Sequence, residues 1–162
     1  MRIEICSRAE AAALIEAAQA PTSVLSITST DEADAVLPCN PNVETILRLK
    51  LNDLTEAYDE EGIPYGRPLP ALSDLSGLKA FVSGLRCECL IVHCWEGVSR
   101  SAAVAAAICE ARGFRDTLRT RQRFSPNPLI YSLACRALGI AEGDLCYAFD
   151  PNDPFRLVKQ VR

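Results

Sequence analysis

Residues 89–101 read Cys-Leu-Ile-Val-His-Cys-Trp-Glu-Gly-Val-Ser-Arg-Ser, and an alanine-rich run over residues 102–108 follows directly. The apolar stretch 90–92 is typical of a strand that is covered on both faces of a parallel sheet. The alanine-rich run predicts a helix that begins soon after this strand. Because such sheets bind ligands at their carboxyl edge, the loop between strand and helix is the expected place for a site.

The loop from Cys94 to Arg100 has the composition of an anion-binding turn. Gly97 can adopt a left-handed conformation, which allows a sharp turn that aims several backbone N–H groups inward. The following helix adds free amides and the positive end of its dipole. Arg100 contributes a planar fork of donors that suits phosphate oxygens. This positive field favours the thiolate form of a cysteine, so we expect Cys94 to be largely ionised at neutral pH.

An anion pocket with a sulfur nucleophile at its floor predicts phosphoryl transfer through a covalent intermediate. The segment resembles the His-Cys-five residues-Arg-Ser/Thr signature of the cysteine-dependent protein tyrosine phosphatase superfamily. Glu96, Gly97 and the triplet Ser99-Arg100-Ser101 resemble its dual-specificity branch most. The resemblance implies an α/β fold with a central, mostly parallel sheet flanked by helices, and a single phosphatase-like domain over residues 1–162.

The resemblance also implies an activity. The chain would be a metal-independent phosphomonoester hydrolase of the tyrosine or dual-specificity protein phosphatase type, which needs no cofactor and forms a cysteinyl-phosphate on Cys94. Arg100 would hold the phosphoryl group, Ser101 would stabilise the departing thiolate, and Ser99 would brace the loop. The expected substrate is a phosphorylated protein or another phosphomonoester. It would be bound by the loop residues Trp95, Glu96, Gly97, Val98, Ser99 and Arg100.

Three aspartates compete for the role of general acid. In the resembling family, an aspartate on the loop after the strand that corresponds to residues 43–51 donates the proton to the leaving group. Asp53 lies just after this stretch and is the first choice. The chain has no Trp-Pro-Asp sequence, and Asp59 and Asp74 remain alternatives.

Two further residues are expected to support the site without contacting the substrate. His93 is the only histidine of the chain. Since neighbours along a strand point to opposite faces, its ring should face away from the Cys94 sulfur and hydrogen-bond to the backbone. Pro126-Asn127 resembles a Pro-Asn pair that follows the signature helix in dual-specificity enzymes, which implies that Asn127 supports the catalytic loop.

Composition and charge exclude several classes of binding partner. With 162 residues and 49% hydrophobic content, the chain fits one globular domain. The net charge of −4 argues against nucleic acid, which needs a basic face. No apolar run approaches the ~20 residues that cross a bilayer, so no membrane partner is expected. The first residues do not form a signal peptide, and the eight cysteines fit a reducing cytoplasm. Their spacing predicts no zinc or other metal site.

The remaining elements follow from periodicity and caps. Strands are expected over residues 2–6, 22–28 and 43–51. Helices are expected after a capping box at Ser7–Glu10, near residues 75–85, before Gly113, and from Asn127 to Gly139. Residues 55–71 read as a loop, which is either an active-site lid or an acidic surface segment. The arginines between residues 112 and 123 fit a solvated face better than a docking patch. The tail from about residue 144 has no assigned role.

Two other functions fit the same loop. A rhodanese-like sulfurtransferase also places its cysteine in an anion-binding loop, although the Arg-Ser ending and the following helix favour a phosphatase. An inactive phosphopeptide-binding pseudophosphatase is the alternative if no carboxylate reaches the site.

Overall fold

Four parallel strands form the centre of the molecule. The computed structural model describes residues 1–113, 124–141, 147–150 and 153–159, and the strands are β1 (Arg2–Ser7), β2 (Thr22–Thr28), β3 (Val43–Lys50) and β4 (Cys89–Cys94). Their order across the sheet is β1-β4-β2-β3, with every neighbouring pair parallel. The α/β class with a central parallel sheet is therefore confirmed. Strand β4 lies between β1 and β2, as its apolar sequence predicted.

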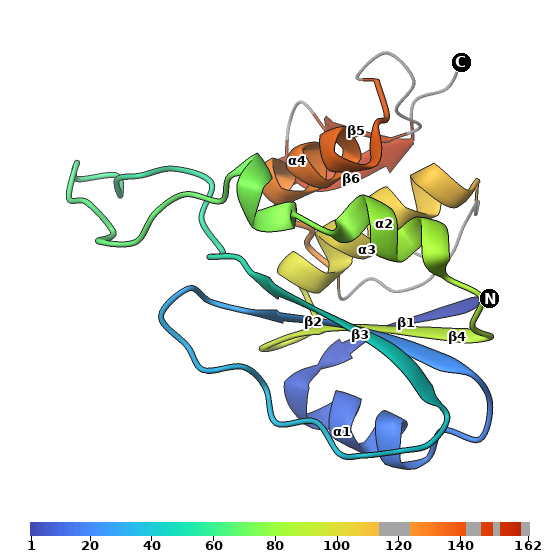
Figure 1. Cartoon of the computed structure of the whole chain (residues 1–162). Coiled ribbons are helices and arrows are strands. Elements are labelled where there is room, and N and C mark those ends of the chain that lie inside the picture. Colours follow the sequence, from blue (N-terminus) through green and yellow to red (C-terminus); the bar gives the residue numbers. More distant parts are fainter. Residues whose placement is uncertain (114–123, 142–146, 151–152, 160–162) are drawn as a thin grey trace.

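Helices cover both faces of this sheet (Figure 1). Helix α1 (Arg8–Glu16) lies on one face, and α2 (Leu78–Gly84), α3 (Arg100–Arg112) and α4 (Pro128–Leu138) lie on the other. A large core fills the space between the sheet and the helices α2, α3 and α4, and a smaller one lies under α1. Residues of β4 alternate between the two cores, because Leu90, Val92 and Cys94 belong to the larger one and Ile91 to the smaller.

The predicted helix ends are confirmed. The Ser7 hydroxyl accepts a hydrogen bond from the Glu10 amide at 3.2 Å, and the Glu10 carboxylate accepts one from the Ser7 amide at 2.8 Å, which forms the expected capping box. The Asn127 side chain accepts from the Ile130 amide at 3.0 Å and caps α4. Gly113 ends α3 in the left-handed conformation that glycine adopts at little cost.

The alanine-rich sequence explains how α3 packs. Residues 102–107 of this helix have no exposed surface, and neither has Ile108. Side chains as small as alanine let the helix lie against the sheet on one side and against α4 on the other. A central helix of this kind can direct its N-terminus at the end of β4 without a long connection.

Some elements differ from the expectation. The helix expected near residues 75–85 is divided into a 3-10 turn, η1 (Leu72–Leu75), and α2, because Gly77 has a φ of +84° and interrupts the helix. The tail contains an antiparallel pair, β5 (Tyr147–Asp150) and β6 (Asp153–Lys159), which the sequence did not reveal. Of the arginine-rich stretch 112–123, residues 114–123 lie outside the described residues.

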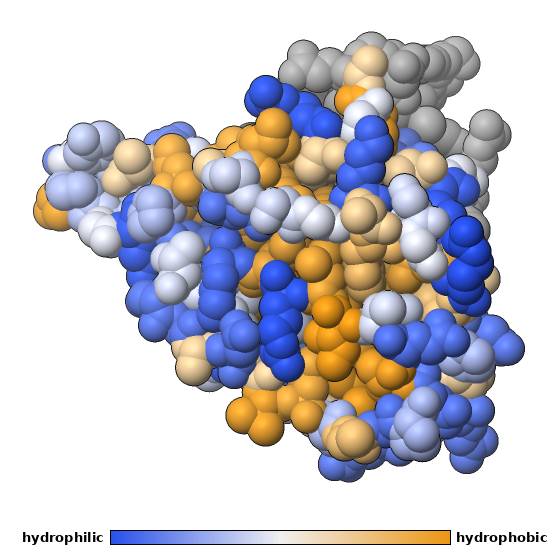
Figure 2. All heavy atoms as spheres, viewed as in Figure 1, coloured by the Kyte–Doolittle hydropathy of each residue, from blue (hydrophilic) through white to orange (hydrophobic). Residues whose placement is uncertain are grey.

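The surface seen in Figure 2 is mixed. Hydrophobic side chains gather near its middle, over β3 and toward α1, with hydrophilic ones around them. Strand β3 is the edge of the sheet, and its Ile46 is exposed. Residues 55–71 form an extended loop that projects from the body (Figure 1), with one isolated bridge between Tyr58 and Pro64. Among the described residues, no helix combines the length and the apolar character that a membrane span requires.

Candidate active site

The candidate site lies where β4 ends and α3 begins. Cys94 is the last residue of β4, and its side chain is 2% exposed. The Gly97 amide donates a hydrogen bond to the Cys94 sulfur at 3.3 Å, and the Ser101 hydroxyl lies 3.2 Å from the same atom. Cys94 is not part of a disulfide. The loop therefore curls around the sulfur and places two polar groups beside it.

Gly97 is required by both its conformation and its surroundings. It has a φ of +75°, where L side chains are strained. A Cβ atom at this position would lie 2.3 Å from the carbonyl carbon of Cys6 and 2.5 Å from the nitrogen of Ser7. The loop thus rests directly on the backbone at the end of β1, which only glycine allows.

Arg100 closes the loop from the helix side. The residue is 6% exposed, and its Nη1 donates hydrogen bonds to the Ser29 hydroxyl at 2.9 Å and the Leu51 carbonyl at 3.2 Å. Its Nε is buried and has no hydrogen-bond partner in the described part of the chain. The Asp53 carboxylate forms an ion pair with it, with Oδ2 at 3.8 Å from Nε. A buried guanidinium with an unused donor is a strong attractor for an oxyanion.

Among the three candidate aspartates, the structure brings Asp53 to the Cys94 loop. Its Oδ1 accepts hydrogen bonds from the Ser99 hydroxyl at 2.7 Å and from the Asn127 amide at 3.0 Å, and its side chain is 38% exposed. Asp59 instead accepts from the Glu61 and Ile63 amides within its own turn. Asp74 accepts from the Ala71 amide at the start of η1. Neither rival lines the cleft that contains Cys94.

That cleft has a volume of about 410 Å³. The sequence predicted that Trp95, Glu96, Val98 and Ser99 would line it together with Cys94 and Arg100, and they do. Gly97 contributes through its amide, which faces the sulfur. The other lining residues come from the ends of β2 and β3 and from the projecting loop, and sequence reasoning missed all but Asp53: Ser29, Glu32, Asn52, Asp53, Leu54 and Arg67.

A signal for most of the missed residues was present. Ser29 directly follows β2, and Asn52 lies just after β3, so the carboxyl-edge rule pointed at both loops. Arg67 had no such signal, because it belongs to a long loop whose position a sequence does not fix. In the structure its guanidinium pairs with Asp31 at 2.7 Å, on the loop after β2.

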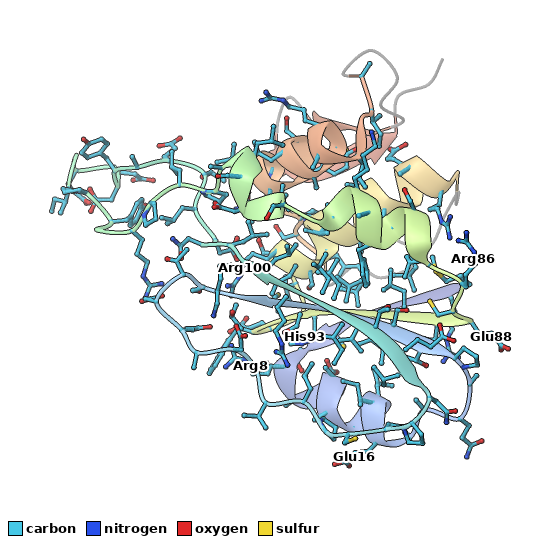
Figure 3. The ribbon with its side chains drawn as sticks, viewed as in Figure 1. Arg8, Glu16, Arg86, Glu88, His93 and Arg100 are labelled. Atoms are coloured by element: carbon cyan, nitrogen blue, oxygen red, sulfur yellow. The ribbon has the colours of Figure 1, made fainter. Side chains whose placement is uncertain are left out.

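His93 departs from one expectation. It has no exposed surface, and neither ring nitrogen reaches hydrogen-bonding geometry with a described residue. The expected hydrogen bond from the ring to the backbone therefore does not reach full geometry, although the ring interacts with the Cys94 backbone. Figure 3 shows the ring on the α1 side of the sheet and Arg100 on the α3 side, so the expected orientation away from the sulfur holds. Burial lowers the pKa of His93 to about 4, which the nearby Cys94 backbone offsets only in part.

Asn127 supports a different segment than expected. Its amide donates to Asp53 Oδ1 and, at 3.3 Å, to the Leu54 carbonyl, while its oxygen caps α4. Its amide nitrogen thus contacts the Asp53 segment rather than the Cys94 loop. The loop is reached nearby by the Ser125 amide, which donates to the Val98 carbonyl at 3.1 Å. Asn127 therefore reaches the loop only indirectly, through Asp53, which accepts a hydrogen bond from Ser99.

Trp95 forms the outer wall of the loop. The residue is 54% exposed, and the Arg8 guanidinium lies 4.6 Å from its ring centroid in a cation–π contact. The Arg8 amide also donates to the Trp95 carbonyl at 3.2 Å. Arg8 thus fixes both the side chain and the backbone of the residue that follows Cys94.

The described residues contain no group of three or more His, Cys, Asp or Glu side chains arranged to hold a metal ion. No protein-family model, curated protein or solved structure matches this chain. The function therefore has to be argued from the site itself.

Proposed function

We propose that the protein is a cysteine-dependent phosphomonoester hydrolase with a dual-specificity phosphatase-like fold. The proposal rests mainly on one arrangement. The Cys94 sulfur lies between the Gly97 amide and the Ser101 hydroxyl, in the same cleft as a buried Arg100 whose Nε is without a hydrogen-bond partner among the described residues. A nucleophile beside an unfilled oxyanion position is what phosphoryl transfer requires.

The first step would be an in-line attack of the Cys94 thiolate on phosphorus. The loop amides and Arg100 would hold the equatorial oxygens while the bond from phosphorus to the leaving oxygen breaks. Asp53 would donate a proton to that oxygen. Its Oδ1 already accepts two hydrogen bonds, so Oδ2 is the oxygen that would carry the proton.

In the second step, water would attack the cysteinyl-phosphate and transfer a proton to Asp53 as the sulfur–phosphorus bond breaks. The released sulfur would regain its negative charge beside the Ser101 hydroxyl, which can donate a hydrogen bond across the observed 3.2 Å. A phosphorylated protein remains the proposed substrate. The loop side chains Trp95, Glu96 and Val98 add no cation that would favour a polyphosphorylated ligand.

Hydrolysis of para-nitrophenyl phosphate in excess chelator tests the proposal. We expect turnover by the wild type and a fall to background for Cys94→Ser, because a hydroxyl lacks the nucleophilicity of a thiolate. Binding of vanadate without turnover would identify an inactive phosphate-binding module instead. A persulfide on Cys94 without phosphatase turnover would indicate a sulfurtransferase, and activity that survives Cys94→Ser would contradict the mechanism.

Asp53→Asn tests the acid. We expect turnover to fall by about 10²- to 10⁴-fold for substrates with poor leaving groups and much less for those with good ones, because only the former need a proton. Asp59→Asn and Asp74→Asn are the matched controls. A larger loss from either control would remove Asp53 from the role.

A further inference from the structure

Among the described residues, the hydrogen bonds of the Arg100 guanidinium are made by Nη1, while Nε lies 3.8 Å from the Asp53 carboxylate without a hydrogen bond. The Nη1 atom donates to the Ser29 hydroxyl at 2.9 Å and to the Leu51 carbonyl at 3.2 Å. Ser29 directly follows β2 and is buried, and Leu51 directly follows β3. The ends of two strands therefore hold the same nitrogen of a residue that starts α3.

This anchoring decides which edge of the guanidinium faces the cleft. In the planar group, the N–H of Nε and one N–H of Nη2 point the same way and form the edge that binds an oxyanion through two hydrogen bonds. Because Nη1 is occupied, the edge formed by Nε and Nη2 remains available to bind an oxyanion. The Nε atom is buried without a hydrogen-bond partner among the described residues. A guanidinium released from Ser29 could turn about its side-chain bonds and lose this orientation.

Ser29 is in turn held in place by a carboxylate. The Ser29 amide donates to Glu32 Oε2 at 3.3 Å, and the Glu32 amide donates to the Ser29 carbonyl at 3.2 Å. The same carboxylate oxygen accepts from Arg8 Nη2 at 2.9 Å, and Arg8 lies over the Trp95 ring. In Figure 3, Arg8 and Arg100 lie at the same end of the sheet. This series of contacts joins the first residue after Cys94 to the last residue of the loop.

We infer that Ser29 is a positioning residue for Arg100, and that it sets the oxyanion-binding edge of the guanidinium through its hydroxyl. The inference rests on the proposed function, since it concerns how the phosphoryl group is held. Ser29 itself need not touch the substrate. Loss of its hydroxyl should weaken oxyanion binding and transition-state stabilisation together.

The test measures vanadate affinity and kcat/KM for para-nitrophenyl phosphate in Ser29→Ala. We expect each to fall by about 10-fold, the effect of one hydrogen bond to a charged group. Ser23→Ala is the matched control. Ser23 is also buried and belongs to β2, but its hydroxyl accepts from Thr45, at 3.0 Å, on the neighbouring strand. The control should keep vanadate affinity within about twofold of the wild type.

A second pair of variants removes the effect of side-chain size. Ser29→Thr and Ser29→Val have the same shape, and only the former keeps a hydroxyl. The threonine variant should bind vanadate about 10-fold more tightly than the valine variant, with a higher kcat as well as a lower KM. Equal affinities for this pair, or equal losses in Ser29→Ala and Ser23→Ala, would overturn the inference while leaving the proposed function intact. A wild-type protein that neither binds vanadate nor hydrolyses the ester would overturn both.

Discussion

At the scale of single residues, Gly97 combines two constraints that usually occur apart. Its positive φ alone favours glycine, and its contact with the backbone of Cys6 and Ser7 excludes any side chain. The amide that this conformation exposes is the one that reaches the Cys94 sulfur. The same residue therefore sets the shape of the loop and one of the two polar contacts of the proposed nucleophile.

The two constraints can be separated with a glycine at the other end of α3. Gly113 has a φ of +67°, and no atom of the described residues lies within 4 Å of a Cβ built on it. Gly113→Ala should cost about 1 to 2 kcal/mol of the free energy of unfolding, from backbone strain alone. Gly97→Ala should cost more than about 3 kcal/mol, because the backbone of Cys6 and Ser7 must also move. Urea denaturation of both variants measures the difference, and similar costs would contradict the close approach.

At the scale of elements, the start of α4 is tied to the loop that follows β3. Asn127 caps the helix with its oxygen and holds Asp53 and Leu54 with its nitrogen. Because both ends of the amide are used, the position of Asp53 depends on where α4 begins. Helix packing on α3 is thereby coupled to the placement of the proposed acid.

Asn127→Ala should therefore affect stability and rate together. Loss of the cap should cost about 1 kcal/mol of unfolding free energy. Turnover of esters with poor leaving groups should fall by about 10-fold, as the acid loses a hydrogen bond that positions it. Ser7→Ala, which removes the cap of α1, is the control for the stability loss alone. If both variants lose the same small fraction of activity, Asn127 has only a capping role.

At the scale of the whole molecule, the only histidine lies at the centre of the sheet. Burial keeps His93 neutral, with a pKa of about 4 in the folded protein against an ordinary value of 6.5. The positive charges of Arg8 and Arg48 lower the pKa of His93 further, by a smaller amount. Between these two pKa values, the unfolded chain binds a proton that the folded one does not, so stability is present above pH 6.5 and is lost as the pH falls toward 4.

This histidine should dominate the response of stability to mild acid. We expect the free energy of unfolding to fall by roughly 2 kcal/mol between pH 7 and pH 5. Denaturant titrations at both pH values would measure the change, with His93→Gln as the control that cannot bind the proton. A variant with the same pH dependence as the wild type would show that other groups carry it.

The local pattern was enough for much of the fold. The apolar run before Cys94 predicted a strand inside a parallel sheet, and the capping box at Ser7, the cap at Asn127 and Gly113 marked helix ends correctly, because these features depend on neighbours within one turn. The same local signals showed that Gly97 would turn and that Arg100 would begin a helix. The sequence analysis did not predict the division of the helix at Gly77, although a glycine inside a helical pattern can indicate such a break.

The tertiary structure decided what depends on distant segments. The position after a strand made Asp53 the first choice among three aspartates, and the fold placed it against Ser99 and Asn127. The contact between Arg100 and Ser29 joins residues from separate strand ends. The pKa of His93 is lowered by burial and, to a smaller extent, by Arg8 and Arg48 from other segments. Sequence alone determines which groups can ionise, turn or cap, since those are properties of a residue and its neighbours. Which of them come into contact, and how far they are buried from solvent, follows only from the packing of the whole chain.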